Sequence, residues 1–502
     1  MSEAEKVQSA SAENKNEIKK LKRKNRRLKT WLVILLAIGV ACGWLLGTFS
    51  PLPVSAGLHS SAGTMTKGDS KNKFEEVLSI MDTDWFFANQ IDDIDTRLTD
   101  QALKGLTDNE EDTHTEYMSE QEIADFTQSI NRNFVGIGVQ FRSTDDGLHI
   151  ITRVLPDSPA EKAGVQAGDI IHAVEGTVVD NKTSTEIKEL VQGEKGTTVS
   201  IDFIREGKVI NIKIVRDEVS STVYGRVKED DIGYLNIQNF GNSTAEEVKS
   251  WLDDFEAQGV TGLIIYLRDD GGGYLDALKG VVDCFLPKNT VFLRRVYSDG
   301  SSDEMKTDGG TYESFGPIVL LVNENTASAA EAFTIAMKEE RDDVTIVGTA
   351  TYGKGTVQIT KYFDDGSALK YTNSKWTSPS GVWVNGTGIE PDETVKLHDV
   401  LYMSYASMED GTSVAFDSVD DKVKEAQSCL DFLGYDVDRM DGYFDVSTQK
   451  ALQQFETDND LSVSEDLTSE VYDSLLTKVV VKWNTDESAD VQLQRAQEIL
   501  HG

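Results

Sequence analysis

The sequence predicts a multidomain protein with a single transmembrane helix, a helical N-terminal region, a β-rich domain, an α/β core and a small helical C-terminal domain. Three observations support this fold class. An uncharged apolar run occupies residues 31–49, the spacing of apolar residues becomes strand-like from Phe134, and buried-type strands alternate with helices over residues 232–400. The length of 502 residues suits about three globular domains.

The charge of the chain is strongly negative and unevenly spread. The chain holds 86 acidic residues against 49 Lys and Arg, a formal net charge of −37, whereas residues 1–30 carry ten basic and four acidic residues. A body this acidic repels phosphate backbones, so we expect no nucleic-acid partner. The three cysteines form no CxxC pair and the six histidines show no ligand spacing. We therefore expect no metal and no cofactor.

The apolar run at residues 31–49 is long enough to cross a hydrocarbon core of about 30 Å as a helix. The basic segment at residues 1–30 lies directly before it, and the positive-inside rule then predicts a cytoplasmic N-terminus. The alternative is a cleaved secretory signal with its cut site at residues 54–56. Both interpretations place the body outside the cytoplasm, and we expect a single-pass protein of the cell membrane.

Two segments link this anchor to the folded body. Residues 50–72 are rich in Ser, Gly and Lys and predict a flexible linker. Residues 73–131 carry apolar residues at helical spacing and predict a helical region. We expect this helical region to serve packing or homodimer formation rather than chemistry.

Residues 132–218 predict the β-rich domain. Apolar residues alternate over 199–204 and 210–214 across a Glu-Gly-Lys turn, which is typical of a hairpin. The segment FVGIGV at 134–139, the segment SPAEKAGVQAGDIIHAVEG at 158–176 and this strand order resemble a PDZ domain.

The PDZ resemblance implies a binding site for a peptide with a free C-terminus. In such domains a glycine-rich loop offers backbone N–H groups to the carboxylate, and the following strand pairs with the peptide. The residues expected at this peptide-carboxylate site are Phe134, Gly136, Ile137 and Gly138. The alternative is that the two glycines belong to an ordinary hairpin.

Residues 219–400 predict the α/β core. Strands are expected at 232–237, 263–267, 318–322 and 344–347, and helices at 244–258 and 329–338. In α/β sheets, functional residues gather where strands end.

Three strand ends carry the candidate catalytic residues. The glycines of RDDGGG at 268–273 allow a backbone amide to point into a site, and Ser328 lies where a helix N-terminus stabilises developing negative charge. Lys354 follows the strand that ends at Val347. A lysine with a pKa lowered by burial can serve as the base that activates a serine. Gln358 can orient the amine without adding negative charge.

The residues alone leave two alternatives open. Residues 328–331 match the capping box S/T-x-x-E, so helix capping by itself accounts for Ser328. Residues 348–354 fit the GxxxxGK pattern of a phosphate-binding loop. In that pattern, however, Gly355 stands where a Ser or Thr must hold magnesium.

The three segments together resemble the carboxyl-terminal processing peptidases, also called tail-specific proteases, which use a Ser–Lys dyad. The family patterns S-A-S-A-S-E, T-F-G-K-G-S-V-Q and L-R-N-N-P-G-G correspond to residues 326–331, 351–358 and 267–273. The resemblance covers about residues 73–400. Departures from the patterns occur at Thr326, Ala330, Gly271, Asp269 and Asp270, and the two aspartates add charge near the site.

The resemblance implies a role for each site residue and for the whole chain. The nucleophile would be Ser328, the base Lys354 and the orienting amide Gln358, with an oxyanion hole made by the N–H groups of Ala329 and of Gly272 or Gly273. The implied function is that of a membrane-anchored, extracytoplasmic serine endopeptidase that processes proteins near or from their C-termini. The alternative is a catalytically silent, PDZ-containing scaffold of the cell wall.

Residues 418–480 predict the small helical C-terminal domain. Apolar residues recur at helical spacing around a Gly-Tyr turn and an Asp-Gly loop. The order of these residues resembles the peptidoglycan-binding domain of cell-wall enzymes, which implies peptidoglycan as a partner. A general helical protein-interaction module is the alternative.

Overall fold

The computed structural model describes residues 67–143, 148–155, 158–179, 182–205, 207–220, 222–227, 231–310, 312–403, 408–409 and 411–502. The chain divides into two compact units, Met1–Asp92 and Asp93–Gly502. The basic segment at 1–30 and the predicted transmembrane run at 31–49 lie outside the described residues. None of the helices in the described ranges has both the length and the apolar character that a bilayer span requires.

The first unit contains α2 (Lys67–Thr83) and the short helix η1 (Ala88–Gln90). Helix α2 begins six residues before the predicted helical region, so the end of the predicted linker is helical. The polar residues before Phe74 extend the helix because adding a residue to an existing helix costs far less than starting one. Phe74 and Val77 of α2 are about half exposed.

The second unit starts with α3 (Ile94–Thr107), β1 (Glu116–Met118) and α4 (Glu120–Asn131). The helices agree with the prediction, whereas β1 was not predicted. β1 pairs antiparallel with β18 (Ala368–Thr377), so that Glu116 lies opposite Lys370. The pairing joins segments some 250 positions apart. The apolar residues on either side of β1 recur at helical spacing, which does not indicate a strand between them.

The predicted PDZ region forms a sheet in the order β3-β4-β5-β7-β8, with β6 paired to β5. Strands β7 and β8 form the predicted hairpin. Strand β3 lies at the edge of the sheet, and β2 pairs with β9 outside it. The elements are β2 (Asn133–Gly136), β3 (Val139–Ser143), β4 (His149–Val154), α5 (Pro159–Ala163), β5 (Ile170–Val174), β6 (Thr177–Val178), α6 (Ser184–Val191), β7 (Thr198–Arg205), β8 (Lys208–Val215) and β9 (Asp217–Ser220).

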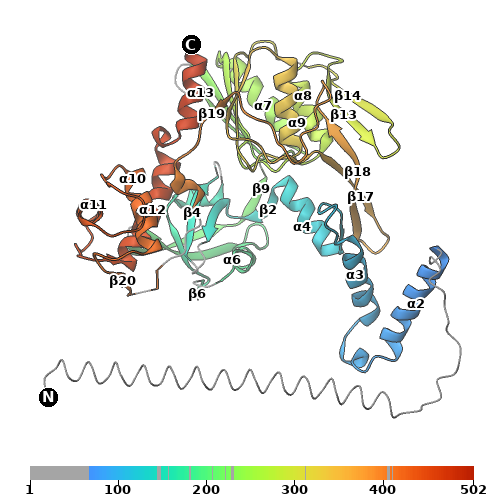
Figure 1. Ribbon diagram of the computed structural model, residues 1–502, viewed down its shortest axis with the longest axis horizontal. Helices are drawn as coiled ribbons and strands as arrows, with labels where there is room; N and C mark the ends of the chain where they lie inside the picture. The colour runs from blue at the N-terminus through green and yellow to red at the C-terminus, as the bar shows by residue number, and fades with distance from the viewer. Residues whose placement is uncertain are drawn as a thin grey trace, which may run out of the picture. The chain divides into compact units, whose positions relative to one another are not determined.

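The α/β core is built on a sheet in the order β10-β11-β12-β15-β16-β19, in which only β10 runs antiparallel to its neighbour. Figure 1 shows two of its helices, α8 and α9, side by side. The four predicted strands and two predicted helices are present with nearly the predicted bounds, whereas β10 and α8 were not predicted. The elements are β10 (Val223–Val227), β11 (Ile232–Ile237), α7 (Thr244–Ala257), β12 (Gly262–Tyr266), α8 (Leu275–Asp283), β15 (Ile318–Val322), α9 (Ala329–Glu340), β16 (Val344–Gly348) and β19 (Glu393–Thr394).

The strands of this sheet are apolar throughout because both faces are covered. Leu263 and Ile265 of β12 pack in a cluster with residues of α7, α8 and α9. Ile264, which points to the opposite face, packs with Leu493 and Ala496 of the last helix, α13 (Val491–His501). The C-terminal helix thus completes the α/β core.

A second sheet, in the order β1-β18-β13-β14 with β17 paired to β18, carries the segment after Lys354. Its other strands are β13 (Val291–Tyr297), β14 (Ser302–Lys306) and β17 (Thr356–Tyr362). β17 begins two residues after Lys354, so its pairing with β18 holds the C-terminal end of the loop that carries Lys354, called the lysine loop below.

The predicted C-terminal domain is helical as expected, around a core that includes Leu430, Phe455 and Leu475. Its last helix continues beyond residue 480, and the chain then leads through η4 to α13 on the core sheet. The elements are η3 (Asp399–Tyr402), β20 (Ser413–Val414), α10 (Asp421–Leu433), α11 (Val446–Asp458), β21 (Leu467–Thr468), α12 (Ser469–Thr485) and η4 (Glu487–Ala489).

Candidate active site

Ser328 lies between β15 and α9 in a strained backbone conformation. Its φ is 56° and its ψ is −115°. A non-glycine residue with positive φ is uncommon, and such strain collects at functional sites. The preceding loop is held by Thr326, whose hydroxyl donates to the carbonyl of Leu267 at 2.8 Å and accepts the N–H of Asn323 at 3.0 Å. The serine is therefore fixed by the loop that precedes it.

The carboxylate of Glu331 joins the serine loop to the lysine loop. Its Oε2 accepts the N–H groups of Ser328 and Lys354, both at 2.8 Å. Its Oε1 accepts the N–H of Gly353 at 2.7 Å and the hydroxyl of Thr351 at 2.6 Å. Glu331 is fully buried, and its four hydrogen bonds fulfil the requirement that a buried charge be paired.

These contacts bear on the capping interpretation of the serine segment. Glu331 accepts the Ser328 N–H, and the predicted capping box is present at the start of α9. The same carboxylate holds two residues of the lysine loop, which helix capping alone does not explain. The sequence showed only the capping pattern, so the second role of Glu331 was missed.

Lys354 is partly buried, and burial lowers the pKa of its amine. The positive charge of Lys370 lowers this pKa further, whereas the carboxylates of Asp112, Glu116 and Glu331 oppose the shift. The net direction is downward, which favours the neutral amine that a general base needs.

Gln358 lies on β17, four residues after Lys354, as the sequence predicted. Its amide donates to the hydroxyls of Thr356 and Thr372, each at 2.9 Å, and not to Lys354. Within the described residues, no hydrogen bond joins the Ser328 hydroxyl to the Lys354 amine. The structure therefore brings the two loops together without a hydrogen bond between the side chains of the predicted dyad.

The glycine loop after β12 packs directly against Ser328. A Cβ on Gly272 would lie 2.8 Å from the backbone nitrogen of Ala329 and 2.8 Å from the Cβ of Ser328. Gly273 has a φ of 152°, and a Cβ there would lie 2.2 Å from the carbonyl oxygen of Phe240. Only glycine permits these approaches, so the loop requires its glycines.

The candidate oxyanion donors differ in availability. The N–H of Gly272 donates to Oδ1 of Asp270 at 2.8 Å. In the part of the chain that the structure describes, the N–H groups of Gly273 and Ala329 have no acceptor. Of the two glycines that the sequence proposed, Gly273 is therefore the one whose N–H is not already engaged within the described residues.

Burial of Asp270 opposes the negative charge that its sequence position suggested. The side chain is fully buried, and burial raises the pKa of its carboxyl well above the ordinary value. The Gly272 N–H and the positive charge of Arg132 act in the opposite direction and are weaker. The net shift is toward the protonated acid, because the cost of burying the charged form outweighs these two contributions.

The proposed peptide-carboxylate residues lie in two different settings. Phe134 and Gly136 belong to β2 and pair with Val219 and Asp217 of β9, so they are not part of an open loop. Ile137 is buried, and Gly138 has a φ of 79°. These two residues lead into the edge strand β3, which is where a peptide could add a strand.

The N-terminal helical region contributes to the surroundings of Lys354, which the sequence did not suggest. Asp112 Oδ1 accepts the hydroxyl of Thr372 at 3.1 Å, and Thr372 in turn accepts the amide of Gln358. Thr115 accepts the N–H of Thr372 at 3.0 Å. Burial lowers the pKa of His114, and the charge of Lys354 lowers it further. We found no sequence signal for these contacts.

Comparisons with known proteins agree with this geometry. Residues 231–395 match "Peptidase family S41", residues 150–205 match "PDZ domain", and residues 419–475 match "Putative peptidoglycan binding domain". The chain is 32% identical over 481 residues to "Carboxy-terminal processing protease CtpA" of Bacillus subtilis (strain 168), covering 95% of this chain and 99% of that protein. The chain belongs to peptidase family S41.

The S41 peptidase resembles further relatives over nearly its whole length. It is 31% identical over 486 residues to "Probable CtpA-like serine protease" of Staphylococcus haemolyticus (strain JCSC1435), covering 96% of this chain and 95% of that protein. The solved photosystem II D1 C-terminal processing protease is 24% identical, with a TM-score of 0.40, over 66% of this chain and 94% of that one. The family resemblance predicted from the sequence is confirmed, and the chain is a peptidase.

Proposed function

We propose that this S41 peptidase is a membrane-anchored, extracytoplasmic serine endopeptidase that cleaves proteins near or from their C-termini by a Ser328–Lys354 dyad. The observation that carries the proposal is the Glu331 carboxylate, which binds the backbone of both residues while burial lowers the pKa of the Lys354 amine. The Ser328 hydroxyl and an amine whose pKa is lowered thus lie on two loops that bind one buried carboxylate, which supports the proposed dyad.

In the proposed acylation step, the Lys354 amine takes the proton of the Ser328 hydroxyl as the oxygen attacks the scissile carbonyl. The N–H groups of Ala329 and Gly273 hold the resulting oxyanion. The Lys354 ammonium then gives its proton to the leaving amine, and an ester to Ser328 remains. In the second step Lys354 deprotonates water, which hydrolyses the ester and releases the enzyme.

Substrate capture is assigned to the PDZ domain. The proposal places a free substrate carboxylate at the backbone of Ile137 and Gly138 and the substrate chain along β3. Two observations support it: β3 is the edge strand of its sheet, and Gly138 directly before it has a φ of 79°, which glycine adopts without strain. The printed name of the Bacillus subtilis relative describes carboxy-terminal processing, which is consistent with recognition of a chain end.

The cellular placement follows from parts of the chain other than the site. The basic segment at 1–30 and the apolar run at 31–49 support a single-pass anchor with the body outside. The match of residues 419–475 supports binding to peptidoglycan. The half-exposed Phe74 and Val77 on α2 support pairing with a second copy of the chain.

The proposed function is tested with two peptides of one sequence, ending in a free carboxylate or in an amide. We expect the full-length chain in detergent to cleave the free peptide with a kcat/KM about 10- to 100-fold higher, because a hydrogen bond to a charged group is worth about 1.5–3 kcal/mol. The Ser328→Ala chain serves as the control for contaminating proteases. Equal rates on both peptides would contradict carboxylate recognition, and absence of Ser328-dependent cleavage would favour the silent scaffold.

The pH dependence of kcat/KM should respond in opposite directions to two substitutions near Lys354. Because only neutral Lys354 is active, activity rises with pH through its pKa. Lys370→Met removes a charge that lowers this pKa, so the rising limb moves to higher pH. Glu116→Gln removes a charge that raises the pKa, so the limb moves to lower pH. Profiles of kcat/KM against pH check both signs, and two shifts in the same direction would refute the assignment of the base.

A further inference from the structure

The chain beyond α12 leaves the peptidoglycan-binding domain and becomes part of the peptidase core. Helix α13 covers the face of the core sheet opposite α7, α8 and α9, through Leu493 and Ala496. The match to the peptidoglycan-binding family ends at residue 475, so α13 lies outside it. This segment therefore has a structural role on the peptidase that neither family match describes.

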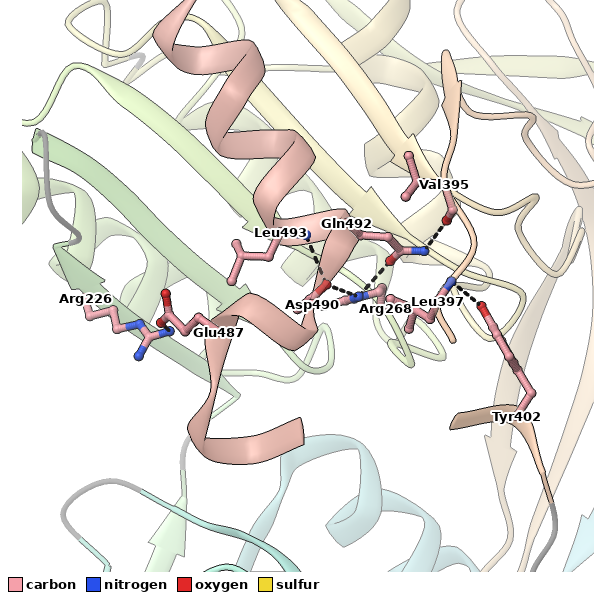
Figure 2. A network of polar contacts seen from close by, with 9 residues as sticks. All are labelled: Arg226, Arg268, Val395, Leu397, Tyr402, Glu487, Asp490, Gln492 and Leu493. Atoms are coloured by element: carbon pink, nitrogen blue, oxygen red, sulfur yellow. Dashed lines mark hydrogen bonds and ion pairs between the residues drawn. The ribbon is translucent and has the colours of Figure 1, made fainter. Parts of the chain in front are cut away.

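The start of α13 contacts Arg268, the first residue after β12. Figure 2 shows the Arg268 guanidinium turned toward Asp490 and Gln492. Nη1 donates to Asp490 Oδ1 at 3.1 Å and to Gln492 Oε1 at 2.7 Å, and Nη2 pairs with Asp490 Oδ2. The guanidinium also lies 4.3 Å from the ring centroid of Tyr266. Arg268 is only 4% exposed, so its position depends on these partners.

The network extends on both sides of Arg268. Gln492 donates to the carbonyl of Val395 at 2.7 Å, which ties it to the chain beside β19 (Figure 2). Asp490 also accepts the N–H of Leu493 at 3.0 Å and so caps α13. Helix capping accounts for one oxygen of this carboxylate, but not for its pairing with a buried arginine.

Arg268 opens the turn that ends in the oxyanion glycines. The next residue, Asp269, has a φ of 62°, and its N–H donates to Asn323 Oδ1 at 2.9 Å. The carbonyl of Asp270 accepts the N–H of Ala327 at 2.9 Å. The turn is thus tied to the serine loop on one side and, through the Arg268 side chain, to α13 on the other.

We propose that Asp490 is a positioning residue for the peptidase reaction, which acts through Arg268 to place the Gly273 N–H where the oxyanion forms. The inference rests on the proposed function, because it assumes that Gly273 and Ala329 stabilise the oxyanion. Asp490 touches neither substrate nor the reacting atoms. It provides the buried counter-charge that keeps Arg268, and with it the turn 268–273, in one place.

The test combines Arg268→Met with Asp490→Asn in the full-length chain. Removing both charges leaves no unpaired buried ion, and asparagine still caps α13. We expect a folded protein whose kcat falls about 10- to 100-fold while KM stays within about twofold, because misplaced oxyanion donors weaken the transition state and not substrate binding. The matched control is Arg495→Gln, which removes the ion pair of α13 with Glu393 and should leave kcat within about twofold.

A second measurement separates positioning from general stability. A peptide aldehyde forms a hemiacetal with Ser328 whose oxygen occupies the oxyanion hole. Its Ki should therefore rise by the same factor by which kcat falls in the double variant. The affinity of an uncleaved peptide, measured in the Ser328→Ala background, should stay unchanged. A merely structural loss would weaken both ligands or lower the fraction of active enzyme.

The outcomes distinguish this inference from the proposed function. If cleavage by the unmodified chain does not depend on Ser328, the proposed function fails whatever the Asp490 variants do. If it does depend on Ser328 and the double variant keeps its kcat and aldehyde Ki, the inference alone is overturned. An equal loss in Arg495→Gln also overturns it. Should the double variant not fold, Gln492→Leu, which removes one Arg268 acceptor, must lower kcat without changing KM.

Discussion

Replacing Ser328 by alanine or Lys354 by methionine is expected to lower kcat for peptide cleavage by roughly 10⁴- to 10⁶-fold, while the protein stays folded. The hydroxyl is the only proposed nucleophile, and the amine is the proposed base in both chemical steps. The arrangement of the loops should survive, because Glu331 binds the backbone of both residues and not their side chains.

The substitution Lys354→Arg tests the base specifically. Arginine also has a long, basic side chain, but its guanidinium stays protonated at any accessible pH, so it cannot accept the serine proton. We expect it to be as inactive as Lys354→Met. The double variant with Ser328→Ala should lose no more than either single variant, because the residues act as a unit. Steady-state kinetics and thermal unfolding check these results, and substantial activity in Lys354→Arg would contradict the dyad.

The second large effect is expected for Glu331→Gln. The glutamine offers one acceptor oxygen where the carboxylate offers two, and its NH₂ group would face N–H donors. Each donor left without a partner in this buried site costs about 1–3 kcal/mol of the free energy of unfolding. Because the serine and lysine loops then lose their common support, kcat should fall about 10²-fold or more.

Glu339→Gln is the matched control for this prediction. Glu339 lies on the same helix, α9, and accepts from the hydroxyls of Ser378 and Ser380 and from the N–H of Ser380, each at 2.7 Å. Its loop carries no proposed catalytic residue. Denaturant unfolding and kcat measured together should show a stability loss in both variants and an activity loss in Glu331→Gln alone. Comparable activity losses would mean that Glu331 stabilises the fold without aligning the dyad.

Much of the core and the location of the candidate site could be predicted from local sequence. Strands such as 232–237 and 318–322 are continuous apolar runs because each is buried on both faces, and such runs are visible in sequence. The serine, lysine and glycine segments follow strand ends, and parallel strands bring these ends to one edge of the sheet. Their proximity was therefore predictable before any contact was known.

Contacts between distant segments could not be predicted in this way. Residues 328–331 have a capping pattern whether or not Glu331 also binds Gly353 and Lys354. The glycine motif likewise does not show that Asp270 accepts the Gly272 N–H, whereas the Gly273 N–H has no acceptor among the described residues. Pairing of Arg268 with Asp490 joins residues 222 positions apart, and neither residue has a local pattern that identifies the other.

The sequence by itself determined the order of the domains, the strands and helices of the core, and the residue types at the site, because periodicity and short motifs are local properties. Only the tertiary structure decided which glycine N–H is already engaged, which carboxylate binds both the serine loop and the lysine loop, and that the last helix covers one face of the core sheet. These features depend on hydrogen bonds and packing between segments that meet only when the chain is folded. Burial in the folded chain also shifts the pKa values of Lys354 and Asp270.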